Sequence, residues 1–226
     1  MRDVLIFDCD GVLVDSEAIA ERTLAKLLTQ WLPDVNVDAA LGQALGMTTA
    51  DILAHFADMS VHDLPLGATA RVDEAIEARL AQELKAMAGV AEVLARTPLP
   101  MAVVSNSRRQ RVVASLASTG LDSVLQGAPI FSADQVRAPK PDPALYLLAA
   151  AELGVAPHCC LVVEDSVAGV SAASAAGMRV IGFTGASHVA PDQTARLLAA
   201  GAWQVIAHME QLPALIARWQ VREKTP

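Results

Sequence analysis

Residues 4–16 read VLIFDCDGVLVDS and combine an apolar run with three acidic residues. The first four residues are all apolar, which is typical of a short strand buried on both faces of a sheet. The run ends abruptly at Asp8, and a second acid, Asp10, follows two positions later. We therefore expect a buried strand that presents two carboxylates at its carboxyl end.

Short apolar runs of the same kind return after residue 89, and stretches with helical spacing separate them. Strands that alternate with helices indicate a parallel sheet with helices on both faces. The expected strands are 101–104, 160–163 and 180–183, with weaker ones at 130–131 and 204–206. The expected helices are 110–119, 144–153, 167–176 and 194–200.

Residues 15–88 have helical spacing and contain no run typical of a buried strand. Ser16 is a candidate N-cap for the first helix of this region. The expected helical segments are 19–31, 39–45, 49–56 and 68–87. The sequence thus predicts an α/β fold, with a Rossmann-like parallel-sheet core over 1–14 and 89–226 and an inserted all-helical domain over 15–88.

The composition limits the classes of partner. The chain has 226 residues and is 53% hydrophobic, so a sizeable core can form. Seventeen basic and 25 acidic residues give a net charge of −8, which argues against a general nucleic-acid or acidic-membrane binder. An anionic substrate would need local positive charge, from a few side chains or from a metal ion.

The sequence also indicates a compartment. It contains no charged leader followed by an apolar stretch and a cleavage site, and no run of the about 18 apolar residues that span a membrane. The chain has three cysteines, Cys9, Cys159 and Cys160, and an odd number with two adjacent does not indicate a set of disulfides. We therefore expect a cytoplasmic protein with reduced thiols. The oligomeric state has no signal in the sequence.

Polar residues follow two more of the expected strands, and a lysine precedes an expected helix. Ligands of open parallel sheets bind beyond the carboxyl ends of the strands, so we expect these residues to meet Asp8 and Asp10 at one edge. They are Ser105, Asn106 and Ser107, then Lys140 between two prolines, then Glu164 and Asp165.

Such a group of acids repels itself unless a cation binds to it, and carboxylate oxygens suit Mg²⁺. Mg²⁺ and Lys140 together would let an anionic phosphate ester approach. One carboxylate can then attack phosphorus while a second transfers protons, and Ser105 and the amide of Asn106 can bind the transferring oxygens. The residues predict a magnesium-dependent phosphatase acting on a small phosphate ester. Spacing alone does not say which of Asp8 and Asp10 is the nucleophile.

Residues 8–16 resemble the first motif, D-x-D-G-x-x-x-D-S, of the haloacid dehalogenase-like hydrolases. Ser105-Asn106, Lys140 and Glu164-Asp165 match the second, third and fourth motifs of that family in order and spacing, and residues 15–88 resemble its helical cap. The resemblance implies an aspartyl-phosphate intermediate and a magnesium ion. It also implies that Asp8 is the nucleophile and that Asp10 is the general acid and base. Ser105 and Lys140 would bind the phosphate. The metal would be bound by Asp8, Asp165 and the backbone carbonyl of Asp10, with Glu164 nearby. Glu164 could bind the metal directly or through water, or could hold a neighbouring loop.

Within the family, segments 101–105, 140–146 and 162–177 are similar to bacterial 6-phosphogluconate phosphatases, which implies a sugar or sugar-acid phosphate as substrate. The main rival is a sugar phosphate mutase of the β-phosphoglucomutase type. Those mutases typically carry a histidine and an arginine at the positions that Ala20 and Thr49 take here, so we expect hydrolysis. A non-catalytic regulatory protein would be expected to lack Asp8, Asp10, Lys140 or Asp165, and all four are present.

Overall fold

The computed structural model describes residues 2–41, 48–187 and 189–222, and the chain divides into two compact units. The core unit comprises residues 1–15 and 85–226, and the helical unit comprises residues 16–84. The chain returns from the helical unit to the core unit at Lys85, four residues before the expected position 89. Residues 85–88 belong with the core because Ala86 pairs with Val14 and the Met87 N–H donates to the Leu13 carbonyl at 2.8 Å.

The core unit is built on a six-stranded parallel sheet with the strand order β3-β2-β1-β4-β5-β6. All six predicted strands are present. Their bounds are β1 Val4–Phe7, β2 Met101–Ser105, β3 Ile130–Ser132, β4 Cys160–Glu164, β5 Arg179–Phe183 and β6 Gln204–Ile206. The chain runs outward from β1 through β2 to β3 and then returns to place β4 on the other side of β1. This reversal makes the carboxyl end of β1 the expected ligand site of such a sheet.

The apolar run of β1 is buried on both faces, as its sequence predicts. All four residues are at most 2% exposed. Val4 and Ile6 belong to a core cluster with residues of α8 (Ala144–Glu152) and α9 (Val167–Ala175). Leu5 and Phe7 point to the opposite face because successive strand side chains alternate.

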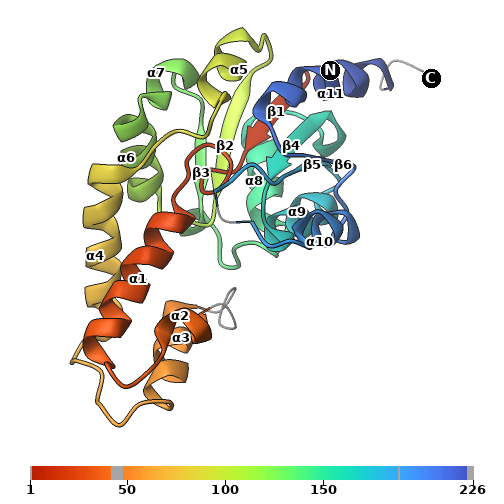
Figure 1. Cartoon of the computed structure of the whole chain (residues 1–226). Coiled ribbons are helices and arrows are strands. Elements are labelled where there is room, and N and C mark those ends of the chain that lie inside the picture. Colours follow the sequence, from red (N-terminus) through yellow and green to blue (C-terminus); the bar gives the residue numbers. More distant parts are fainter. Residues whose placement is uncertain (1, 42–47, 188, 223–226) are drawn as a thin grey trace. The chain divides into compact units, whose positions relative to one another are not determined.

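Helices flank the sheet on both faces (Figure 1). Those with predicted counterparts are α6 Arg109–Thr119, α8, α9 and α10 Gln193–Ala199. The sequence analysis did not identify α5 Val90–Arg96, α7 Leu121–Leu125 and α11 Leu212–Arg222, or the 3-10 turns η1 Ala133–Gln135, η2 Pro157–Cys159 and η3 Met209–Gln211. Among the described residues, every helix is too short or too polar to cross a membrane.

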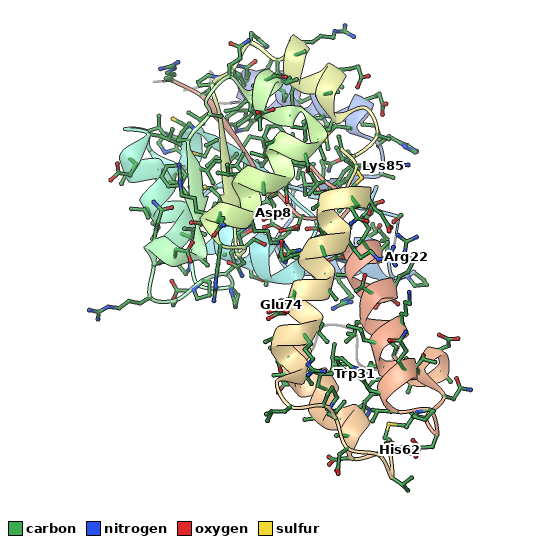
Figure 2. All side chains as sticks on the ribbon, turned by 90° about the vertical axis from the view of Figure 1, so that its left-hand side faces the viewer. Asp8, Arg22, Trp31, His62, Glu74 and Lys85 are labelled. Carbon is green, nitrogen blue, oxygen red and sulfur yellow. The ribbon has the colours of Figure 1, made fainter. Side chains whose placement is uncertain are left out.

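The helical unit consists of α1 Glu17–Trp31, α2 Val37–Leu41, α3 Thr49–Ala57 and α4 Ala68–Glu83. Within it α1 and α4 run side by side, and Trp31 and His62 lie toward the same end (Figure 2). Its own core contains Leu28, Phe56 and Val72, all fully buried. The expected segment 39–45 extends past the described residues, which also exclude Gly46 and Met47.

Two expected helix starts have different outcomes. Ser16 occupies the N-cap position of α1, as the sequence predicts, but its side chain makes no capping hydrogen bond there. Thr48 caps α3, accepting from the Asp51 N–H at 3.2 Å.

Candidate active site

Asp8 is the first residue after β1, and its backbone N–H extends the ladder by donating to the Val163 carbonyl at 3.0 Å. This bond fixes Asp8 beside the carboxyl end of β4. The loop then turns at once, since the N–H groups of Leu13 and Val14 both donate to the Cys9 carbonyl. The turn needs Gly11, whose φ of +79° lies in the left-handed region that side chains other than glycine rarely adopt.

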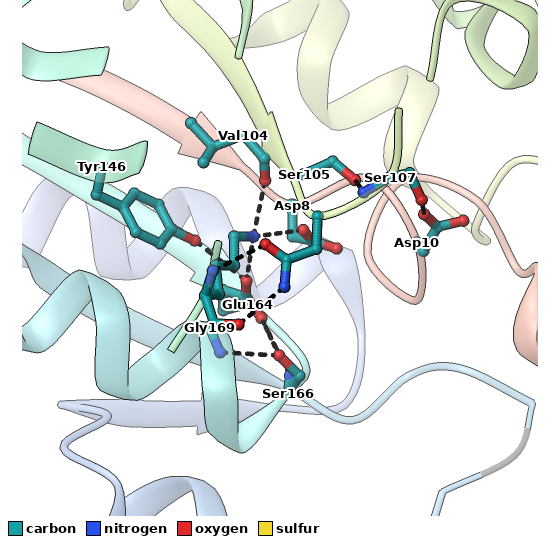
Figure 3. A network of polar contacts seen from close by, with 11 residues as sticks. Asp8, Asp10, Val104, Ser105, Ser107, Tyr146, Glu164, Ser166 and Gly169 are labelled. Carbon is teal, nitrogen blue, oxygen red and sulfur yellow. Dashed lines mark hydrogen bonds and ion pairs between the residues drawn. The ribbon is translucent and has the colours of Figure 1, made fainter. Parts of the chain in front are cut away.

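Lys140 lies in the loop before α8 and joins the network of polar contacts around Asp8 and Glu164 that Figure 3 shows. Its ammonium donates to Asp8 Oδ1 at 2.6 Å, to Glu164 Oε1 at 2.6 Å and to the Val104 carbonyl at 2.8 Å. The Lys140 side chain is 3% exposed. A buried cation thus bridges two carboxylates from two different strand ends.

Glu164 is completely buried, and each of its oxygens accepts two hydrogen bonds. Oε1 accepts from Lys140 and from the Tyr146 hydroxyl at 3.1 Å, and Oε2 accepts from the N–H and the hydroxyl of Ser166 at 3.1 and 3.0 Å. A Cβ on Gly169 would overlap this carboxylate, so the glycine lets α9 approach it. The geometry holds Glu164 as the partner of Lys140 and as an anchor for the start of α9.

Ser105 ends β2, Asn106 and Ser107 follow it, and the three side chains have different partners. Asn106 exchanges a pair of hydrogen bonds with the backbone of Lys140, at 2.9 and 3.0 Å, and so locks the lysine loop onto the end of β2. With this side chain engaged, a phosphate contact from Asn106 has to come from its backbone N–H. Ser105 is buried beside Asp8, and its hydroxyl accepts from the Ser107 N–H at 3.0 Å.

Asp10 has two partners that the sequence analysis did not assign. The Ser107 hydroxyl donates to Asp10 Oδ2 at 2.7 Å, and the Arg111 guanidinium lies 3.8 Å from Oδ1. Ser107 had a sequence signal as the third residue of the polar triplet after β2, whereas Arg111 had none. The Tyr146 contact with Glu164 was also missed, although Tyr146 is the only tyrosine in the chain and occupies the first turn of a helix just after Pro143.

Asp165 meets the loop that carries Asp8 and Asp10. A Cβ on Gly11 would overlap the Asp165 carboxylate, so this carboxylate lies directly against the Gly11 backbone. These loops carry carboxylate and carbonyl oxygens, which are the ligands that suit Mg²⁺. No three acidic, histidine or cysteine side chains gather as a ready-made metal site in the described part of the chain. The donor set therefore fits magnesium only if the Asp10 carbonyl takes part.

The electrostatics of the site are dominated by burial. Burial raises the pKa of Asp8 to about 8, and the neighbouring Glu164 and Asp10 carboxylates add to the rise while Lys140 opposes it. Burial lowers the pKa of Lys140, but Asp8 and Glu164 outweigh this effect and hold the pKa well above its usual range. Lys140 therefore stays positively charged, but the acidic groups around it outnumber it. A bound divalent cation would reduce the repulsion between these acids.

Comparison with known proteins identifies a family. The family model for haloacid dehalogenase-like hydrolases matches residues 5–183. The chain is 29% identical to 6-phosphogluconate phosphatase of Escherichia coli K12 over 97% of its own length and 96% of the relative. It is 32% identical to hexitol phosphatase A of the same organism, with 85% of each chain covered.

A solved structure agrees with this likeness. The crystal structure of a haloacid dehalogenase-like protein of unknown function from Agrobacterium tumefaciens C58 superposes with a TM-score of 0.86 at 40% identity. The match covers 97% of this chain and all of the other. Both the sheet and the helical unit therefore have counterparts in one known protein.

Proposed function

Because the chain belongs to the haloacid dehalogenase-like hydrolase family and is a phosphoric monoester hydrolase, we propose that it hydrolyses a small sugar or sugar-acid phosphate through an aspartyl-phosphate on Asp8. The observation that carries this proposal is the position of Asp8. It is the first residue beyond the central strand, and Lys140 holds its carboxylate at 2.6 Å. A carboxylate oriented by a fixed cation is suited to attack phosphorus.

Asp10 is suited to the proton transfers. It lies two residues beyond Asp8 and is more exposed, with 23% of its side chain accessible. Ser107 donates a hydrogen bond to one of its oxygens, and the Arg111 guanidinium lies near the other. In the proposed reaction Asp10 protonates the leaving oxygen of the substrate and then removes a proton from the water that attacks the aspartyl-phosphate.

The oxygens of the transferring phosphoryl group would be bound by Lys140, Ser105 and the Asn106 N–H. Lys140 has a fixed position because Glu164, Asn106 and the Val104 carbonyl all hold it. Positive charge placed beforehand where negative charge accumulates lowers the barrier to phosphoryl transfer.

Magnesium would be held by Asp8, Asp165 and the backbone carbonyl of Asp10. When bound, it would neutralise the acids and polarise the phosphoryl group. We assign Glu164 to Lys140 and not to the metal, because both of its oxygens already accept two hydrogen bonds.

The test is a phosphate-release screen over sugar and sugar-acid phosphates, including 6-phosphogluconate and hexitol phosphates, with Mg²⁺ present. Asp8→Asn should abolish turnover, and chelation of the metal should do the same. A matched control is Asp122→Asn, which removes an equal charge from an exposed position in α7. Wild-type turnover by Asp8→Asn, or full activity in chelator, would contradict the proposed mechanism.

A further inference from the structure

The start of α10 contacts the loop after β4, which carries Asp165. The Gln193 side chain donates from Nε2 to the backbone carbonyl of Asp165 at 2.6 Å, across 28 residues of sequence. Asp165 is the residue whose carboxylate lies against Gly11 and which we propose as a magnesium ligand. The bond is made to the main chain, so it acts on where the whole residue sits and not on the charge of its side chain.

The neighbours of Asp165 are held by other means. Glu164 is fixed by Lys140 and Tyr146, and Ser166 caps α9 by accepting from the Gly169 N–H at 3.0 Å. Asp165 stands between these two fixed residues. Loss of the bond to its carbonyl would let the Asp165 backbone move, and the carboxylate attached to that backbone would move relative to the Gly11 turn.

Gln193 is itself well anchored. Its backbone N–H donates to the Ala190 carbonyl at 3.0 Å, and Leu197, one turn along α10, is fully buried. Earlier in the same connection, the Ser187 hydroxyl and N–H donate to Asp15 Oδ1 at 3.0 and 3.4 Å. The connection after β5 is therefore tied both to the loop after β1, through Asp15, and to the loop after β4, through Asp165.

We propose that Gln193 is a positioning residue for the metal ligand Asp165. This inference rests on the proposed function, because it assumes that Asp165 binds the cation. Groups that orient a metal ligand typically contribute about 10- to 100-fold to metal affinity. Loss of the Gln193 amide should therefore weaken metal binding while leaving the fold of the metal-free protein intact.

The experiment compares Gln193→Met with the wild type in the full chain. Methionine has a similar length and no N–H donor. Mn²⁺, used as a paramagnetic substitute for Mg²⁺, is titrated into metal-free protein without substrate, and free ion is measured by electron paramagnetic resonance. We expect the dissociation constant to rise about tenfold in Gln193→Met. The melting temperature of the metal-free variant should stay within about 3 °C of the wild type, a shift near 1 kcal/mol for a chain of this size.

Two further variants separate the possible outcomes. Thr194→Ala changes the next, exposed residue of α10 and should leave Mn²⁺ affinity unchanged. Asp165→Asn should weaken binding more than Gln193→Met does. Unchanged affinity in Gln193→Met, with a loss in Asp165→Asn, would overturn the positioning role and leave the metal site standing. Unchanged affinity in both variants would instead remove Asp165 from the proposed metal site. Weaker binding accompanied by a large drop in the metal-free melting temperature would assign Gln193 to packing and also overturn the role.

Discussion

Replacing Asp8 with asparagine should stabilise the metal-free protein at neutral pH even though it removes activity. In the native site Asp8 is buried beside Glu164, and Lys140 is shared between the two acids. One buried cation cannot fully compensate two carboxylates. Asparagine keeps the shape and one acceptor oxygen for Lys140, and it is neutral without taking up a proton on folding.

The magnitude follows from the pKa of Asp8, which burial raises from 3.8 to about 8. The native state then holds this proton more tightly than the unfolded chain does. The resulting stabilisation is complete below about pH 4, declines as the pH rises, and is lost above about pH 8. At about 1.4 kcal/mol per pKa unit the upper limit is roughly 6 kcal/mol. Rearrangement and water entry reduce such effects, so we expect wild type to lose about 1–3 kcal/mol relative to Asp8→Asn between pH 5 and pH 8.

The assay is thermal unfolding in chelator at several pH values. A difference of about 1–3 kcal/mol corresponds to a change of roughly 2–12 °C in melting temperature for a chain of this size. Asp122→Asn, at an exposed position in α7, is the control and should show the same pH dependence as the wild type. Mg²⁺ should restore most of the lost stability in the wild type and much less in Asp8→Asn, because binding to the native state is stabilising. Parallel pH profiles for wild type and Asp8→Asn, or an asparagine variant that is less stable at pH 8, would refute the reasoning.

Three other expectations concern neighbouring parts of the site. Gly11→Ala should reduce kcat/KM about 100-fold in a phosphate-release assay. The added Cβ would displace the Asp165 carboxylate, and the positive φ at this position disfavours alanine. Near-normal kinetics would show that the contact between Gly11 and Asp165 is dispensable. Glu164→Gln should lower kcat about tenfold or more by weakening the hold on Lys140, while the Mg²⁺ concentration for half-maximal rate stays close to that of the wild type. A large rise in that concentration would make Glu164 a metal ligand. With β-glucose 1-phosphate and a bisphosphate primer, free phosphate should form faster than glucose 6-phosphate, because β-phosphoglucomutases typically carry a histidine at the position of Ala20 and an alanine side chain cannot donate a hydrogen bond. The reverse ratio would favour a mutase.

The sequence predicted the central strands β1, β2, β4 and β5 well because they are largely buried on both faces and therefore carry apolar runs. The edge strands β3 and β6 are less buried and contain Ser132 and Gln204, so their signals were weaker. The short helices α5 and α7 were missed for another reason. They have seven and five residues, and helices of this length are stabilised by tertiary packing and carry little periodic signal of their own.

The sequence also predicted which residues gather at the site. Asp8, Ser105 and Glu164 each stand at the carboxyl end of a strand, and neighbouring parallel strands bring those ends together at one edge of the sheet. The pattern of residue types was enough to indicate acids, a lysine and a cation. It could not say what each acid contacts.

Those partnerships were decided by the tertiary structure. Glu164 and Asp165 are adjacent in sequence, yet the first is completely buried against Lys140 while the second lies on the Gly11 turn. Ser107 reaches Asp10 across 97 residues, and Gln193 reaches the Asp165 carbonyl across 28. Periodicity records which face of an element is apolar, because burial acts on every residue of that face. A single polar contact between distant loops leaves no such repeat, and it exists only once packing has brought the two loops together.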